Sequence, residues 1–185
     1  DYGNRGNKRA IQFFCDAPAS NDPISLEDAG NGYLFRRGHV VVFCAWQGDM
    51  LPGNGRMLLD VPVATDVTGT VRTEFIVDRA GIFTMPLSGF ASMHSYPATS
   101  RNPAKAQLTR RRYPDEPRET ITGWQFAYIQ TGFGLDGQGS EEGLVASDCN
   151  IHMPGGFEAG YIYEIIYEAR DPLVLGLGFV AVRDF

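Results

Sequence analysis

The chain contains few cysteines, few basic residues and no long apolar segment. Its three cysteines, Cys15, Cys44 and Cys149, are too few for a disulfide framework, and no Cys-x-x-Cys pair offers a metal site. No apolar run approaches the roughly 18 residues that a membrane-spanning helix needs, so we predict no membrane span. The 16 Lys and Arg are outnumbered by 22 Asp and Glu, and the net charge of −6 argues against a nucleic-acid partner. The three histidines are scattered, and we predict no metal and no cofactor.

Glycine and proline are abundant instead. The 22 Gly and 11 Pro among 185 residues predict many turns and loops, and 43% hydrophobic residues is ordinary for a globular protein. This length is enough for one domain with a sizeable core, or for a core that carries an insertion.

Residues 40–45 form a distinctive apolar run, because they carry no polar side chain except the thiol of Cys44. A run this short and apolar on both faces predicts a strand buried on both sides, as in parallel or mixed sheets covered by helices. The preceding segment predicts a helix with Ser25 as N-cap and Gly38 as C-cap. A helix, a glycine and a buried strand form the second half of a strand–helix–strand unit, so we expect an α/β fold.

Residues 46–55 have loop composition and follow the carboxyl end of this strand. Ligands bind at that edge of open α/β sheets, so Trp46 and Asp49 are candidates for a pocket wall and a polar contact. In the alternative interpretation, Trp46 packs in the core and Asp49 caps a turn.

From Arg56 onward the sequence alternates in the manner of antiparallel strands. The alternating segments are residues 70–77, 106–110, 124–129, 143–152 and 161–168. No helical pattern occurs between Arg56 and Asp171, and Asp171, as an N-cap followed by Pro172, predicts a helix start. We therefore predict a β-rich layer or small sandwich between two α/β segments.

Two short segments each have a structural and a functional interpretation. Residues 1–8 are rich in Gly and Asn, which tolerate positive φ, so they predict either a surface turn or a loop whose N–H groups bind an oxyanion. Three arginines at 110–112 precede Asp115, Glu116 and Glu119, and this mixture predicts a charged hairpin rather than a nucleic-acid site.

Several segments along the chain belong to one pattern. They are residues 4–10 (NRGNKRA), 37–42 (RGHVVV), 46–49 (WQGD), 69–75 (GTVRTEF), 134–139 (GLDGQG), 154–158 (PGGFE) with 163–164, 169–178 (ARDPLVLGLG) and 181–185 (AVRDF). Together they resemble the bacterial alpha/beta hydrolase domain family, a group of serine hydrolases. The resemblance spans essentially the whole chain, and the segment at 169–178 is its longest part.

The resemblance implies a partial α/β-hydrolase-type core with a large β-rich insertion. Residues 1–55 are then the amino-terminal part of the core, residues 56–160 are the insertion or lid, and residues 161–185 return to the core. The substrate implied for the complete protein is a small-molecule carboxylic ester or a related acyl compound.

The same resemblance implies roles for five residues. Arg5 and Gly6 lie in the loop that supplies one of the two oxyanion N–H groups in α/β-hydrolases. Trp46, Gln47 and Asp49 are then substrate-binding residues near the active-site edge.

The sequence departs from the family at the nucleophile. An α/β-hydrolase carries its Ser in a Gly-x-Ser-x-Gly elbow, and this motif does not occur here. In the family the elbow follows the helix predicted at Asp171, so we expect the Ser, the acid and the His beyond Phe185. The chain is then a fragment that supplies the oxyanion loop, pocket wall and lid, and we expect it to be inactive by itself.

Two other functions are compatible with the residues. A β-rich layer with aromatic side chains and a Gly-rich loop is also typical of a non-catalytic module that binds a carbohydrate or a partner protein. The third hypothesis is a thiol enzyme that uses Cys15 or Cys149, with His152 as the base. Alternation along a strand places Cys149 and His152 on opposite faces, which argues against it.

Overall fold

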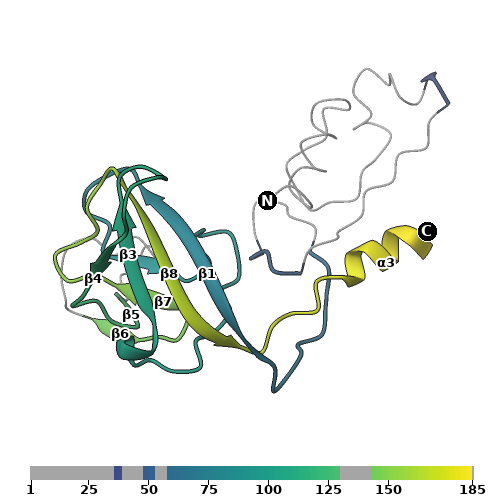
Figure 1. The fold of residues 1–185 in the computed structure, drawn as a ribbon. Helices are drawn as coiled ribbons and strands as arrows, with labels where there is room; N and C mark the ends of the chain where they lie inside the picture. The colour runs from purple at the N-terminus through teal and green to yellow at the C-terminus, as the bar shows by residue number, and fades with distance from the viewer. Residues whose placement is uncertain (1–35, 39–47, 53–57, 130–142, 185) are drawn as a thin grey trace. The chain divides into compact units, whose positions relative to one another are not determined.

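Figure 1 shows the computed structural model of the chain. The structure describes residues 36–38, 48–52, 58–129 and 143–184. The chain forms two compact units, one made of Asp1–Val63 and Leu173–Phe185 and the other of Ala64–Pro172. We call Ala64–Pro172 the inserted unit, because it lies in sequence between the two parts of the first unit.

A four-stranded antiparallel sheet is the framework of the inserted unit (Figure 1). Its strands, in spatial order, are β1 (Thr68–Val77), β8 (Tyr161–Arg170), β3 (Gln107–Arg111) and β4 (Glu119–Ile121). β1 and β8 pair over their full ten residues, from Thr68 opposite Arg170 to Val77 opposite Tyr161. The first and last strands of the unit are therefore joined along their whole length.

The alternation of side chains decides which face of the sheet is buried. In β8, Tyr163, Ile165 and Tyr167 are almost completely buried on one face. In β1, Phe75 is buried while its neighbour Ile76 is 68% exposed. This period-two alternation is typical of antiparallel strands with one face on the core. It confirms the strands predicted at residues 70–77, 106–110 and 161–168.

Two shorter ladders pack against the buried face of the sheet. They are β2 (Thr84–Pro86) with β7 (Asn150–His152), and β5 (Ala127–Ile129) with β6 (Leu144–Ala146). One core cluster includes Phe75 and Ile165 from the sheet together with Leu87, Phe126 and Ile151 from the shorter ladders and their flanks. A single-turn 3-10 helix, η2 (Pro103–Lys105), precedes β3. The unit is therefore a layered β structure around one hydrophobic core.

The turn after β2 lies against the edge strand β1. Gly89 has a φ of +74°, and an added Cβ would lie 2.9 Å from Cγ2 of Thr73 and 3.1 Å from the carbonyl oxygen of Glu74. Both the backbone conformation and the lack of space favour glycine. The turn covers part of an edge that could otherwise pair with other strands.

The predicted α/β fold is wrong for the described residues. Every strand pair there is antiparallel, and α3 (Leu177–Asp184), the α-helix that lies wholly within them, has 8 residues. The apolar run at residues 40–45, which favoured a parallel sheet, lies outside the described part of the chain. The family resemblance implied that residues 161–168 return the chain to a hydrolase core, but they form β8 inside the antiparallel sheet. Their sequence suits this position, since the polar Glu164 lies between Tyr163 and Ile165, which face the core.

The helix predicted to begin at Asp171 begins instead at Leu177. Asp171 has a φ of 54°, a left-handed conformation that does not suit a helix N-cap, and its Oδ1 accepts a hydrogen bond from the N–H of Asp66 at 3.3 Å. The N–H of Ala64 donates to the carbonyl oxygen of Pro172 at 2.8 Å. Asp171 and Pro172 therefore close the inserted unit rather than open a helix.

Candidate functional site

Of the five residues predicted to form a site, the structure describes Asp49 alone. Arg5, Gly6, Trp46 and Gln47 lie outside the described residues, so their roles stay predictions. Asp49 is 5% exposed, and its Oδ1 has no hydrogen-bond partner in the described structure. A buried carboxylate oxygen without a partner is energetically costly and calls for an explanation.

The inserted unit contains a separate concavity, which we call the end pocket, at the end of the sheet where β1 stops and β8 begins. Its volume is about 430 Å³, which lies within the usual range of small-molecule sites. It is lined by Ala80, Gly81, Arg110, Ile121, Met153, Gly155, Gly156, Phe157, Glu158, Ala159 and Tyr163. Its walls thus come from β3, β4, β8, the turn after β1 and the loop before β8.

Strand register positions the polar wall of the end pocket. One row across the four strands consists of Phe75, Tyr163, Arg110 and Glu119. Arg110 Nε donates to Glu119 Oε2 at 2.9 Å, and Arg110 Nη1 donates to Glu158 Oε2 at 2.8 Å. The hydrogen bond to Glu119 is the main reason that the pKa of Arg110 is raised, so the guanidinium stays charged. The polar wall therefore exists before any ligand arrives.

Residues 154–160 form the loop that brings Glu158 to this row. The backbone N–H of Glu158 donates to Tyr163 Oη at 2.8 Å. The ring of Phe157 is buried and packs edge-on against Phe75 at 5.5 Å and Tyr163 at 5.1 Å between centroids. Together with the hydrogen bond from the N–H of Gly160 to the carbonyl oxygen of Val77 at 2.8 Å, these contacts anchor the loop to the sheet.

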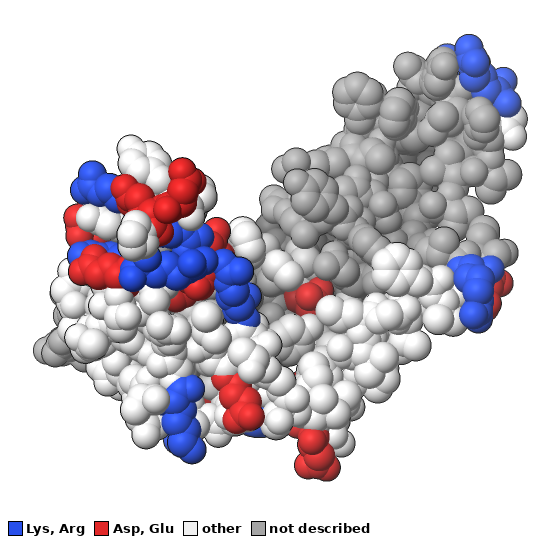
Figure 2. Space-filling model, in the orientation of Figure 1, with Lys and Arg blue, Asp and Glu red and all other residues white. Residues whose placement is uncertain are grey.

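Charged side chains crowd together at this end of the inserted unit, where Figure 2 shows blue and red residues interleaved. Arg110 and Arg112 both lie over the ring of Tyr161, with their Cζ atoms 4.6 Å and 5.0 Å from its centroid. Cation–π contacts of this kind hold guanidinium groups in place. The ring of Tyr161 is therefore a contact that the two guanidinium groups share.

The opposite face of the sheet carries a second group, the outer-face cluster of Arg72, Glu74, Arg111, Arg118 and Glu164. The side chain of Glu164 is 3% exposed; it accepts a hydrogen bond from Arg72 Nε at 2.6 Å and pairs with Arg118 Nε at 3.0 Å. Arg111 is also buried and donates to Glu74. We assign this cluster to stability, because its ion pairs join β1, β3, β8 and the β3–β4 hairpin.

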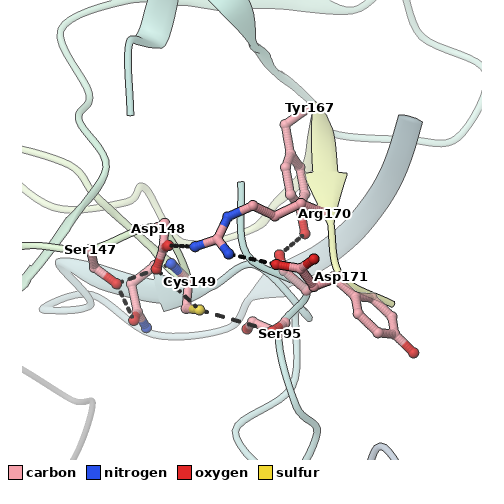
Figure 3. Close-up of polar contacts among 9 residues, drawn as sticks. Ser95, Ser147, Asp148, Cys149, Tyr167, Arg170 and Asp171 are labelled. Atoms are coloured by element: carbon pink, nitrogen blue, oxygen red, sulfur yellow. Dashed lines mark hydrogen bonds and ion pairs between the residues drawn. The ribbon is translucent and has the colours of Figure 1, made fainter. Parts of the chain in front are cut away.

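Figure 3 shows a third polar group, around Cys149. Arg170 pairs with Asp148 at 2.7 Å and with Asp171 at 2.6 Å, and Cys149 Sγ lies 3.6 Å from Asp148 Oδ1. Burial, followed by the charge of Asp148, raises the pKa of the Cys149 thiol to about 11. A nucleophilic cysteine needs a lowered pKa, so this setting argues against Cys149 as a catalytic thiol.

The end pocket is a site that the sequence analysis missed. The hairpin predicted around the three arginines is confirmed by the pairing of β3 with β4 and by the ion pair of Arg110 with Glu119. The contact of Arg110 with Glu158 joins residues 48 positions apart, and no local pattern predicts it. The adjacent glycines at 155 and 156, both with positive φ, are the signal for the loop that makes this contact possible.

The described residues contain no group of three or more His, Cys, Asp or Glu placed to hold a metal ion. Within the same part of the chain, no helix is long and apolar enough to cross a membrane.

Comparisons with known proteins gave no match. A scan against family models found no matching family, and searches of curated proteins and of solved structures found no similar protein. They neither support nor refute the resemblance to the alpha/beta hydrolase domain family, which stays a prediction.

Proposed function

We propose that the inserted unit is a ligand-binding module and that the end pocket is its binding site. The observation that supports this most is the fixed polar wall. Arg110, Glu119 and Glu158 are held by strand register and ion pairs beside a concavity of about 430 Å³. Small-molecule sites are typically pre-formed and concave, with a few well-placed polar groups in a largely apolar lining.

The lining favours binding over covalent catalysis. The described residues that form it include no Ser, Thr, Cys, Lys or His, the usual nucleophiles and proton-transfer groups. Glu158 accepts a hydrogen bond from Arg110, so the carboxylate is engaged in the wall of the pocket. These residues are suited to contact a ligand and to orient it.

An NMR titration tests this proposal. We expect at least one compound in a panel of neutral sugars, dicarboxylates, nucleotides and amino acids to shift the backbone amides of Gly81, Gly155 and Gly156 in the ¹⁵N-labelled chain. Ala159→Trp should abolish the shift, because Ala159 is exposed and lines the pocket. The matched control is Ala104→Trp, at an exposed alanine in η2 outside the pocket. A shift that persists in Ala159→Trp, or its absence for every compound, contradicts the proposal.

A second candidate function, ester hydrolysis by the complete protein, is favoured by Asp49. We propose from the family resemblance that Asp49 contacts a small-molecule ester, since its buried Oδ1 lacks a partner in the described structure and a substrate donor can supply one. Sequencing the coding DNA beyond Phe185 should reveal a Gly-x-Ser-x-Gly motif. In that complete protein, Asp49→Asn should lower kcat/KM for ethyl lactate, whose hydroxyl can donate to the carboxylate, about tenfold, the value of roughly one hydrogen bond to a charged group, and should leave kcat/KM for ethyl propionate, which has no donor, unchanged. Absence of the motif, or unchanged kinetics with ethyl lactate, rejects this candidate.

A further inference from the structure

We infer that the end pocket selects an uncharged ligand with neighbouring hydroxyl groups, that is, a saccharide. This inference rests on the proposed function, because it names the ligand class of the same site. Three features support this inference. The charges of the pocket balance, hydrogen-bond donors lie beside acceptors in its wall, and glycines leave part of its backbone uncovered by side chains.

The charges around the end pocket cancel. The lining contains one guanidinium group, Arg110, and one carboxylate, Glu158, and Arg110 is in contact both with Glu158 and with the neighbouring Glu119. An anionic ligand has to displace a carboxylate from Arg110, and a cationic ligand has to compete with Arg110 for the same carboxylates. An uncharged ligand has neither cost.

Donors and acceptors lie next to each other in the polar wall. Arg110 Nη1 and Glu158 Oε2 are 2.8 Å apart, so one ligand hydroxyl can accept from the guanidinium while its neighbour donates to the carboxylate. The side chains of Glu119 and Glu158 are 60% and 54% exposed, and a carboxylate has about four acceptor positions. Acceptor positions therefore remain open to a ligand that donates hydrogen bonds, as hydroxyl groups do.

The remaining wall suits the flat apolar face of a sugar ring. Ile121, which is partly exposed, and Ala159, which is exposed, contribute apolar surface to the lining. Gly81 and Gly155 have φ angles of +85° and +81°, and a Cβ added at either would meet nothing within 4 Å. Open space above a bare backbone lets a ring approach closely and hydrogen-bond to peptide groups.

Matched glycosides test the ligand class on the complete 185-residue chain. The neutral probes are the methyl glycosides of glucose, galactose, mannose and xylose; the charged probes are glucuronate and glucosamine. We expect at least one neutral glycoside, and neither charged sugar, to shift the amides of Gly81, Gly155 and Gly156.

Glu158→Gln provides a second measurement. It keeps the size of the side chain and leaves the cluster with one excess positive charge, so affinity for the neutral glycoside should fall about tenfold, the value of one charge-assisted hydrogen bond, and glucuronate should begin to bind. Glu168→Gln, at an exposed glutamate of β8 outside the pocket, should bind like the unmodified chain.

The outcomes separate this inference from the proposed function. If a charged sugar or a nucleotide shifts the pocket amides and no neutral glycoside does, the inference is wrong and the ligand-binding module stands. If no compound of either panel shifts them, both are wrong. Equal loss of affinity in Glu158→Gln and Glu168→Gln also overturns the inference.

Discussion

Glu164 is a buried carboxylate in the middle of the sheet, directly opposite Glu74 on β1. Like charges opposite each other destabilise a strand pair, so this arrangement depends on the arginines of the outer-face cluster. Burial alone would raise the pKa of Glu164, but hydrogen bonds from Arg72 and Arg118 outweigh it and lower the pKa below its ordinary 4.5. The charged form is therefore the one that the folded protein needs.

Replacing this carboxylate tests its contribution to stability. Glu164→Gln should lower the free energy of unfolding by about 3 kcal/mol, because it leaves the buried Arg111 and its neighbours with one fewer counter-charge. Urea unfolding measures the loss, and Glu168→Gln on the exposed part of the same strand is the control, with a change of about 0.5 kcal/mol or less. Equal effects of the two substitutions would show that burial of Glu164 is unimportant.

The same carboxylate predicts how stability depends on pH. Since the pKa is lower in the folded state, the contribution of Glu164 is complete above the ordinary value of 4.5 and is lost as the pH falls toward the folded-state pKa. The free energy of unfolding of the unmodified chain should therefore fall steeply as the pH drops below 4.5. In Glu164→Gln it should fall less steeply. Parallel pH curves for the two proteins would contradict this assignment.

Cys149 should react slowly with alkylating reagents. A thiol pKa of about 11, against an ordinary 9.0, leaves about a hundred-fold less thiolate at pH 8, and the thiolate is the reactive form. The rate of Cys149 labelling by iodoacetamide, followed by mass spectrometry of its peptide, should rise about a hundred-fold when urea unfolds the chain. A rate in the folded protein equal to that of the unfolded protein would restore Cys149 as a candidate nucleophile.

Among the structural elements, the turn at Gly89 and the edge strand β1 have to fit together. Gly89→Ala combines the cost of a positive φ with contacts to Thr73 and Glu74, whereas Gly123→Ala has a similar φ of +80° and no atom within 4 Å of the new Cβ. Both substitutions should cost about 1 kcal/mol from the backbone, and Gly89→Ala should cost roughly 1 to 2 kcal/mol more. Urea unfolding measures the difference, and equal costs would mean that the turn does not press against β1.

The elements that could be predicted are those that depend on a local sequence pattern, and the features that could not be predicted depend on contacts between residues far apart in the sequence. Alternation predicted β1, β3 and β8, because each has one face on the core and so repeats with period two. The α/β class was inferred from residues 40–45, and the family resemblance placed the strand at 161–168 in the same core, although Glu164 and Glu168 already mark that strand as half polar. The end pocket could not be predicted, since it depends on register: Arg110 meets Glu119 and Glu158 only after β3, β4 and β8 have aligned.

For the molecule as a whole, the inserted unit contains what an autonomous domain needs. All residues of its core cluster lie between Val71 and Ala169, and its two ends meet where Ala64 bonds to Pro172. The N–H of Asp171 also bonds to the carbonyl oxygen of Val67 at 3.0 Å, directly beside the ten-residue pairing of β1 with β8. Ends that lie together let a domain be inserted into another chain segment, or removed from it, without strain.

Residues 64–172 expressed alone should therefore fold. We expect a dispersed ¹H–¹⁵N NMR spectrum, a cooperative urea transition and amide positions for Gly155 and Gly156 close to those in the complete chain. The matched control is a fragment of residues 64–160, which lacks β8 and with it the partner of both β1 and β3, and should be unfolded. A collapsed spectrum for residues 64–172 would mean that the first unit contributes to this core. A folded fragment would instead place the end pocket on a domain whose ligand binding can be measured by itself.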